Sequence, residues 1–202
     1  MAAASSEALG APPRGAFVGV VGPSGAGKDS VMSRAQALLR RDVSIVFPQR
    51  IVTRSPDAAE NNVSMSASDF ERIGKGGGFA LAWSAHDLSY AVPVKVDSLV
   101  AQGRVVVVNV SRSVVPALRQ RYARGVVVLI DAPVDLRRAR LAQRGREDDL
   151  AVTARLKRAV GGFVPADADI VIDNSGPIER SAEALANYLA SLTTIQAPAE
   201  NA

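Results

Sequence analysis

A glycine-rich stretch near the start of the chain carries the residues best suited to chemistry. It follows an apolar strand-like run and precedes a helix-like one, the context in which a Gly-x-x-x-x-Gly-Lys loop holds nucleotide phosphates. Its backbone N–H groups and the helix N-terminus favour anions. The pattern predicts an ATP site in which Lys28 reaches the β- and γ-phosphates, and a plain glycine turn is the alternative. The residues are Gly22, Pro23, Ser24, Gly25, Ala26, Gly27, Lys28, Asp29 and Ser30.

Asp29 departs from the usual pattern, because the residue after the lysine is normally Ser or Thr, whose hydroxyl binds Mg²⁺. A carboxylate beside a triphosphate is repulsive unless a cation lies between them, and Mg²⁺ prefers oxygen ligands. Asp29, with Ser30, is therefore a candidate Mg²⁺ ligand. Asp29 can equally be a helix N-cap or first-turn residue that the helix dipole favours. Asp131, at the end of a later apolar run, is a rival organiser of Mg²⁺.

Five short apolar runs predict a parallel sheet that helices cover on both faces. The expected strands are 16–21, 44–47, 104–110, 126–131 and 169–173. The expected helices are 30–40, 114–124, 134–144, 150–160 and 178–192. The alternation predicts a doubly wound α/β fold, the three-layer P-loop NTPase architecture with a five-stranded parallel sheet.

One segment, at about 54–93, does not follow this alternation. Within it, Ser66 and Asp69 have the spacing of a capping box at the start of a short helix. Glycines end that helix, and a strand-like stretch follows at 79–86. We expect a small insertion on the core sheet, placed where an acceptor site can be built.

Arginines after the fourth expected strand predict a short lid at about 143–150. Arginines that a closing lid brings to the phosphates stabilise the charge of the transferring phosphoryl group and exclude water. A solvated basic helix is the alternative. The candidate residues are Arg140, Arg144 and Arg146.

The composition fits one folded domain, 16–193, that handles anions. Of 202 residues, 48% are apolar, and the net charge of +4 suits nucleotides and sugar phosphates. The basic residues are scattered and nearly all Arg, so no nucleic-acid partner is expected. No run approaches the roughly 20 apolar residues of a membrane span, and cysteines are absent, so we expect a cytoplasmic protein. The ends, 1–15 and 194–202, are expected to be a disordered leader and tail.

The loop resembles that of the guanylate-kinase-like kinases, and over about 17–176 the chain resembles one group of them, the ribose 1,5-bisphosphate phosphokinases. Lys28-Asp29-Ser30 and the Trp-x-Ala-His of 83–86 are the most specific signals. Ala91, Val110 and Asp87 stand where this family usually has Gly. The residues that carry the resemblance are 22–30, 50–54, 60–63, 79–86, Tyr90, Pro93, 107–112, 144–147 and 173–176.

This resemblance implies transfer of the γ-phosphoryl group of ATP, with Mg²⁺, to the 1-phosphate of ribose 1,5-bisphosphate. The products would be ADP and 5-phospho-α-D-ribose 1-diphosphate, formed during phosphonate breakdown and used in nucleotide and NAD synthesis. A guanylate kinase is one alternative. A non-catalytic interaction module is another, although such modules typically lose the loop lysine or glycines that this chain keeps. A monomer or homodimer acting on a small sugar phosphate is expected.

The acceptor-site candidates lie in or beside the insertion. Arg50 and Arg54 can clamp an acceptor phosphate, since Arg suits phosphates better than it suits a purine. Related kinases often have an Asp where Asn109 ends the third strand, so Asp29 can supply the missing charge. Turn, core or solvent roles are the alternatives for the other candidates. The full set is Arg50, Thr53, Arg54, Glu60, Trp83, His86, Tyr90, Asn109 and Arg112.

Overall fold

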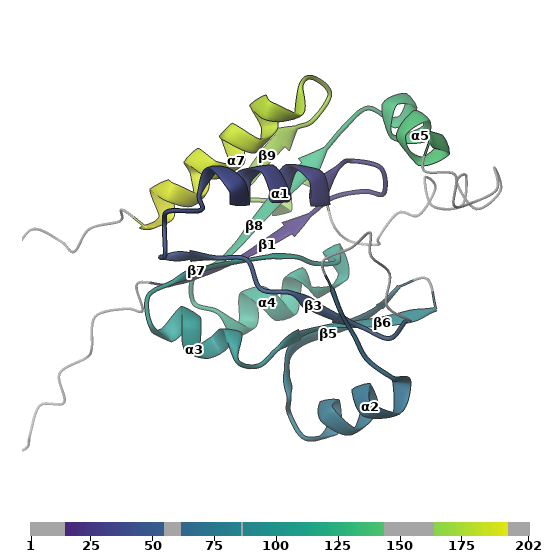
Figure 1. Cartoon of the computed structure of the whole chain (residues 1–202), viewed down its shortest axis with the longest axis vertical. Coiled ribbons are helices and arrows are strands. Elements are labelled where there is room, and N and C mark those ends of the chain that lie inside the picture. Colours follow the sequence, from purple (N-terminus) through teal and green to yellow (C-terminus); the bar gives the residue numbers. More distant parts are fainter. Residues whose placement is uncertain (1–14, 55–61, 86, 144–163, 194–202) are drawn as a thin grey trace, which may run out of the picture.

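The computed structural model describes residues 15–54, 62–85, 87–143 and 164–193, and its core is a five-stranded parallel sheet (Figure 1). The strand order is β2–β7–β1–β8–β9, and every pairing is parallel. The predicted fold class is confirmed, and each of the five predicted strands is present. Their bounds are β1 Ala16–Val21, β2 Ile45–Val46, β7 Val105–Asn109, β8 Gly125–Asp131 and β9 Ile170–Asp173.

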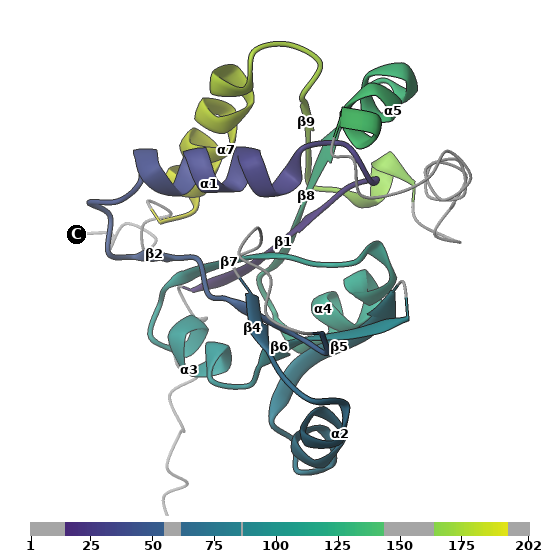
Figure 2. The same ribbon diagram turned by 45° about the vertical axis from the view of Figure 1, so that its right-hand side comes forward.

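The central strand β1 is buried along its whole length, which explains its unbroken apolar sequence. Val18 and Val20 face one core cluster, under α1 (Lys28–Leu38) and α7 (Ile178–Thr193). Phe17 belongs to the opposite cluster. Both views show α1 and α7 on one face of the sheet and two further helices on the other (Figures 1 and 2). Those helices are α3 Val96–Ala101 and α4 Val115–Arg121.

The predicted helices agree with the structure to within a few residues wherever residues are described. The helix expected at 114–124 ends earlier and is preceded by one 3₁₀ turn, η1 (Arg112–Val114). At the start of α5 (Val134–Gln143), the carbonyl of Pro133 accepts the N–H of Arg137 at 3.0 Å. The short helix α3 was not predicted, and the expected helix at 150–160 lies outside the described residues. In the described part of the chain, no helix is long and apolar enough to cross a membrane.

The insertion is a four-stranded sheet with the order β4–β3–β6–β5 and one helix, α2 (Ala67–Lys75). It lies on the side of the core sheet that α3 and α4 cover (Figures 1 and 2). Ser66 caps α2 as predicted, because its Oγ accepts the N–H of Asp69 at 3.1 Å. Only β5 was expected as a strand, and the sheet begins at Arg50 rather than Arg54. The strands are β3 Arg50–Val52, β4 Asn62–Ser64, β5 Phe79–Ala85 and β6 Leu88–Pro93.

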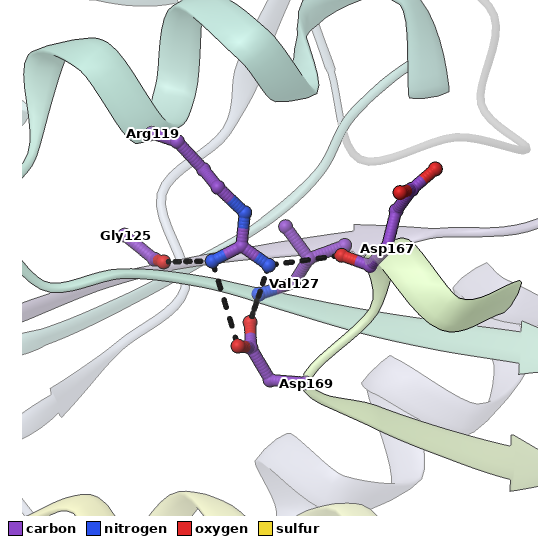
Figure 3. Close-up of polar contacts among 5 residues, drawn as sticks. All are labelled: Arg119, Gly125, Val127, Asp167 and Asp169. Atoms are coloured by element: carbon purple, nitrogen blue, oxygen red, sulfur yellow. Dashed lines mark hydrogen bonds and ion pairs between the residues drawn. The ribbon is translucent and has the colours of Figure 1, made fainter. Parts of the chain in front are cut away.

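A polar network joins the start of β8 to the start of β9 (Figure 3). It lies at the N-terminal end of these strands, and the phosphate loop follows the C-terminal end of β1. Arg119, on α4, donates to the Asp169 carboxylate at 3.0 Å and to the carbonyls of Gly125 and Asp167 at 3.1 and 2.9 Å. The same carboxylate accepts the N–H of Val127 at 2.7 Å. The network thereby fixes the position of β9, whose far end reaches the phosphate loop.

Candidate active site

The glycine-rich loop joins the end of β1 to the start of α1, as predicted. Gly25 and Gly27 have φ angles of 81° and 86°, the left-handed region that favours glycine. A Cβ on Gly25 would lie 2.7 Å from the carbonyl oxygen of Arg137, and a Cβ on Gly27 would lie 2.5 Å from Nδ2 of Asn174. Both glycines are therefore required by backbone conformation and by close packing against later segments.

Lys28 is the first residue of α1, and its side chain folds back along the loop. Its Nζ donates to the carbonyl oxygens of Gly22 at 2.8 Å and Pro23 at 3.1 Å. The ammonium charge is thus held beside the loop backbone. This is the position from which a loop lysine can reach nucleotide phosphates.

Asp29 and Asn109 lie together, although 80 residues separate them in the sequence. The Asn109 side-chain amide donates to Oδ1 of Asp29 at 2.6 Å. Gly27, not Asp29, is the N-cap of α1, so the structure excludes the N-cap alternative and leaves Asp29 in the first turn. The rival, Asp131, instead accepts the N–H of Ala132 at 2.8 Å.

The donor set around Asp29 fits Mg²⁺ better than a metal held by protein ligands alone. No group of three or more His, Cys, Asp or Glu side chains lies together among the described residues. Asp29 and Ser30 are both exposed beside the loop. One carboxylate and one hydroxyl, completed by water and substrate phosphates, is a typical Mg²⁺ environment.

Asn174 connects the phosphate loop to the end of the sheet. It is 1% exposed. Its Nδ2 donates to the carbonyl of Ala26 at 2.8 Å, and its backbone N–H donates to the backbone carbonyl of Asp131 at 2.8 Å. Its own carbonyl accepts Nη2 of Arg140 at 2.9 Å. Sequence reasoning gave Asn174 no role, although a polar residue directly after a strand of the core sheet is a signal that could have found it.

Of the three candidate lid arginines, the structure describes Arg140, which lies on α5. Its Nη1 is buried without a hydrogen-bond partner in the described part of the chain, and it lies 3.7 Å from the Cβ position of Gly27. The guanidinium is therefore against the phosphate loop. Arg144, Arg146 and the expected lid at 144–150 lie outside the described residues.

Arg50 is the centre of the acceptor-side cluster. Its Nε donates to Oδ1 of Asn62 at 3.2 Å, and its Nη1 donates to the carbonyl of Asn109 at 3.1 Å. Its guanidinium carbon lies 5.7 Å from the ring centre of Tyr90, which stacks on Trp83 at 5.6 Å. Arg50, Asn62 and Asn109 line a cavity of about 230 Å³ that Asp29 also borders. Asn62 is the member of this cluster that sequence reasoning missed.

The remaining candidates do not all join this cluster. The hydroxyl of Thr53 accepts the N–H of Ser89 at 2.8 Å, so it joins β3 to β6, which fits its structural alternative. Burial lowers the pKa of Arg112, the charge of Asp131 opposes that shift, and the charge of Arg137 adds to it. Arg54 is the second residue after the end of β3. Glu60 and His86 lie outside the described residues.

Several curated relatives are similar to this chain over most of its length. A ribose 1,5-bisphosphate phosphokinase of Bradyrhizobium diazoefficiens is 49% identical over 162 residues, covering 80% of this chain and 81% of the relative. Proteins of the same name from Rhodopseudomonas palustris and Brucella melitensis are 45% and 44% identical, covering 85% and 88% of this chain and 87% and 93% of the relatives. No protein-family model matches the chain.

A solved structure supports the fold independently. The crystal structure of guanylate kinase from Anaplasma phagocytophilum matches with a TM-score of 0.64 at 18% identity, covering 89% of this chain and 87% of that chain. At that identity the likeness concerns the fold alone. It confirms the guanylate-kinase-like architecture, in which a core parallel sheet carries a small second sheet.

Proposed function

The chain belongs to the ribose 1,5-bisphosphate phosphokinase family, and we propose that it transfers the γ-phosphoryl group of ATP to the 1-phosphate of ribose 1,5-bisphosphate. The products are ADP and 5-phospho-α-D-ribose 1-diphosphate. The observation that carries this proposal is the position of Arg50 in a cavity that Asp29, next to Lys28, also lines. A cation at that place suits a phosphorylated sugar better than a nucleobase.

In the proposed reaction an oxygen of the acceptor 1-phosphate bonds to the γ-phosphorus, and the bond from that phosphorus to the β–γ bridging oxygen breaks. ADP leaves with the electron pair. The acceptor phosphate is already an anionic nucleophile at neutral pH, so no general base is needed. The protein contributes positioning and positive charge.

Lys28 and Arg140 supply this charge from two sides of the loop. Lys28 lies along the loop backbone, and Asn174 holds Arg140 against it. Both cations then neutralise charge that develops on the phosphoryl oxygens and on the leaving ADP.

Asp29 and Ser30 would hold Mg²⁺, and Asn109 would fix the orientation of the Asp29 carboxylate. When bound, Mg²⁺ neutralises charge on the β- and γ-phosphate oxygens of ATP. We also propose that the protein is a cytoplasmic monomer or homodimer, because its proposed substrates are small and soluble.

The function is tested by incubating the purified protein with ATP, Mg²⁺ and either ribose 1,5-bisphosphate or GMP. We expect ADP release and a new diphosphate signal in the ³¹P NMR spectrum with the sugar acceptor, and little ADP release with GMP. Lys28→Ala should lower the rate by on the order of 100-fold or more, whereas Arg34→Ala, on the exposed side of α1, should not. Faster turnover of GMP than of the sugar phosphate would contradict the proposal.

A further inference from the structure

The cavity beside Arg50 extends away from the phosphate loop, along α1. Its helix wall includes Asp29, Ser33 and Gln36, whose spacing of four and three residues places them on one stripe of the helix. That stripe covers about 10 Å at the rise of an α-helix. Asp29 marks the end nearest the loop, and Gln36 lies about two helical turns farther along α1.

Arg50 is the single cation among the described residues that line this cavity. Two of its five N–H groups are used, by Asn62 and by the carbonyl of Asn109, which leaves three available for a ligand. Within the described part of the chain, both partners are neutral oxygens and no carboxylate pairs with it. A guanidinium with a fixed plane and unused donors is suited to bidentate contact with a phosphate.

The acceptor in the proposed function carries two phosphates at opposite ends of a ribose ring. The 1-phosphate reacts, so it must lie against the γ-phosphate of ATP at the loop. The other phosphate must then point away from the loop, in the direction in which the cavity leads. The side chains of Ser33, Gln36 and Asn62, which also line the cavity, can hydrogen-bond the sugar hydroxyls.

We propose that Arg50 binds the non-reacting 5-phosphate of the acceptor and thereby makes the enzyme select a sugar bisphosphate over a sugar monophosphate. This inference rests on the proposed function and assigns Arg50 to one end of that substrate. Asn62 and the Asn109 carbonyl orient the guanidinium, and the Tyr90 ring beneath it adds a cation–π contact. Asn62 is in this account a positioning residue.

The test compares ribose 1,5-bisphosphate with ribose 1-phosphate, which has the same reacting phosphate and lacks the 5-phosphate. ADP release is measured for the wild type, Arg50→Ala, Arg50→Lys and the surface control Arg34→Ala. Arg50→Ala should lower kcat/KM for the bisphosphate by roughly 10- to 100-fold and change kcat/KM for the monophosphate by less than about 3-fold. Arg50→Lys, which keeps the charge and loses the planar fork, should give an intermediate loss for the bisphosphate alone, and Arg34→Ala should change neither.

Equal losses with both acceptors would overturn the proposal, because Arg50 would then act at the reacting end or on the fold. Unchanged kinetics with both would also overturn it. Circular dichroism of each variant separates misfolding from lost recognition, and Arg50→Lys decides the question if Arg50→Ala does not fold. Failure of the proposed function looks different, since the wild type would then turn over neither acceptor.

Discussion

The carboxylate of Asp29 accepts a hydrogen bond of 2.6 Å from the side-chain amide of Asn109. Two departures from the usual pattern therefore meet in space: a carboxylate where the loop normally has a hydroxyl, and an amide where related kinases often have a carboxylate. The pair still holds one negative charge and one neutral group. We infer that Asp29, in the first turn of α1 next to Lys28, supplies the charge that related kinases often carry at the end of β7.

If Asp29 binds Mg²⁺, placing a carboxylate at position 109 should restore part of the Mg²⁺-dependent activity that is lost when Asp29 is replaced. Asp29→Ser should raise the Mg²⁺ concentration for half-maximal activity by roughly 10- to 100-fold, because the carboxylate ligand is lost. The double variant Asp29→Ser with Asn109→Asp should recover part of that loss. The measurement is a Mg²⁺ titration of ADP release at fixed ATP. Identical titrations for the wild type and Asp29→Ser, or no recovery in the double variant, would count against the metal role.

Gly27 offers a second test, because the chain contains a matched control for its backbone conformation. Gly27→Ala combines an unfavourable φ of 86° with a clash at 2.5 Å against Asn174, whereas Gly77→Ala has a φ of 73° and no atom within 4 Å. The left-handed conformation alone costs an alanine about 1–2 kcal/mol. We expect Gly77→Ala to lower the melting temperature slightly and to bind ATP normally.

Gly27→Ala should in addition weaken ATP binding, because the added methyl group separates the loop from Asn174. Isothermal titration with a non-hydrolysable ATP analogue measures this effect directly. Equal ATP affinity in the two alanine variants would show that the contact between Gly27 and Asn174 does not shape the loop.

The core of this fold could be predicted from the sequence because its signals are local. The strand β1 is a continuous apolar run that ends at a glycine loop, and α7 has a clear amphipathic period. The small sheet gives no such signal. Its strands β3 and β4 have three residues each, and their pairing with distant partners decides their conformation.

The polar contacts of the site were harder to predict for the same reason. Arg50 was expected to act with Arg54, and its hydrogen-bond partners, Asn62 and Asn109, are 12 and 59 residues away. Asn174 reaches the loop across 148 residues. Spacing along a chain cannot report such contacts, because they depend on where separate strands begin and end in space.

Variants that remove the contacts of Asp169 should lower the stability of the fold and leave catalysis unchanged. Asp169→Ala removes the acceptor of the buried Val127 N–H and the ion pair with Arg119, so it should lower the free energy of unfolding by about 1–3 kcal/mol. Arg119→Ala should cost less, because the pair is 36–40% exposed. Denaturant unfolding measures both. The exposed Arg138→Ala is the control.

Because this network lies at the N-terminal end of the strands and the phosphate loop at their C-terminal end, kcat of the folded variants should equal that of the wild type. A lower kcat at temperatures where Asp169→Ala is fully folded would mean that the far end of β9 transmits the change to the loop. Equal losses of stability in the two variants would show that the contacts of Arg119, and not the Val127 hydrogen bond, dominate.

Asp97 gives a prediction for the dependence of stability on pH. Burial raises the pKa of its carboxyl, but hydrogen bonds from Arg121 and from the Tyr122 hydroxyl, the latter at 2.6 Å, outweigh burial and hold the pKa below its ordinary value of 3.8. A lowered pKa in the folded state means that Asp97 stabilises the fold above pH 3.8, and that this contribution disappears as the pH falls through the folded-state pKa.

The melting temperature of Asp97→Asn should therefore lie below that of the wild type at pH 7, and the difference between the two should shrink between about pH 5 and about pH 3. The control is Asp135→Asn, which replaces a fully exposed carboxylate on α5, and its melting temperature should show no such convergence with that of the wild type. A difference for Asp97→Asn that widens on acidification would contradict the prediction.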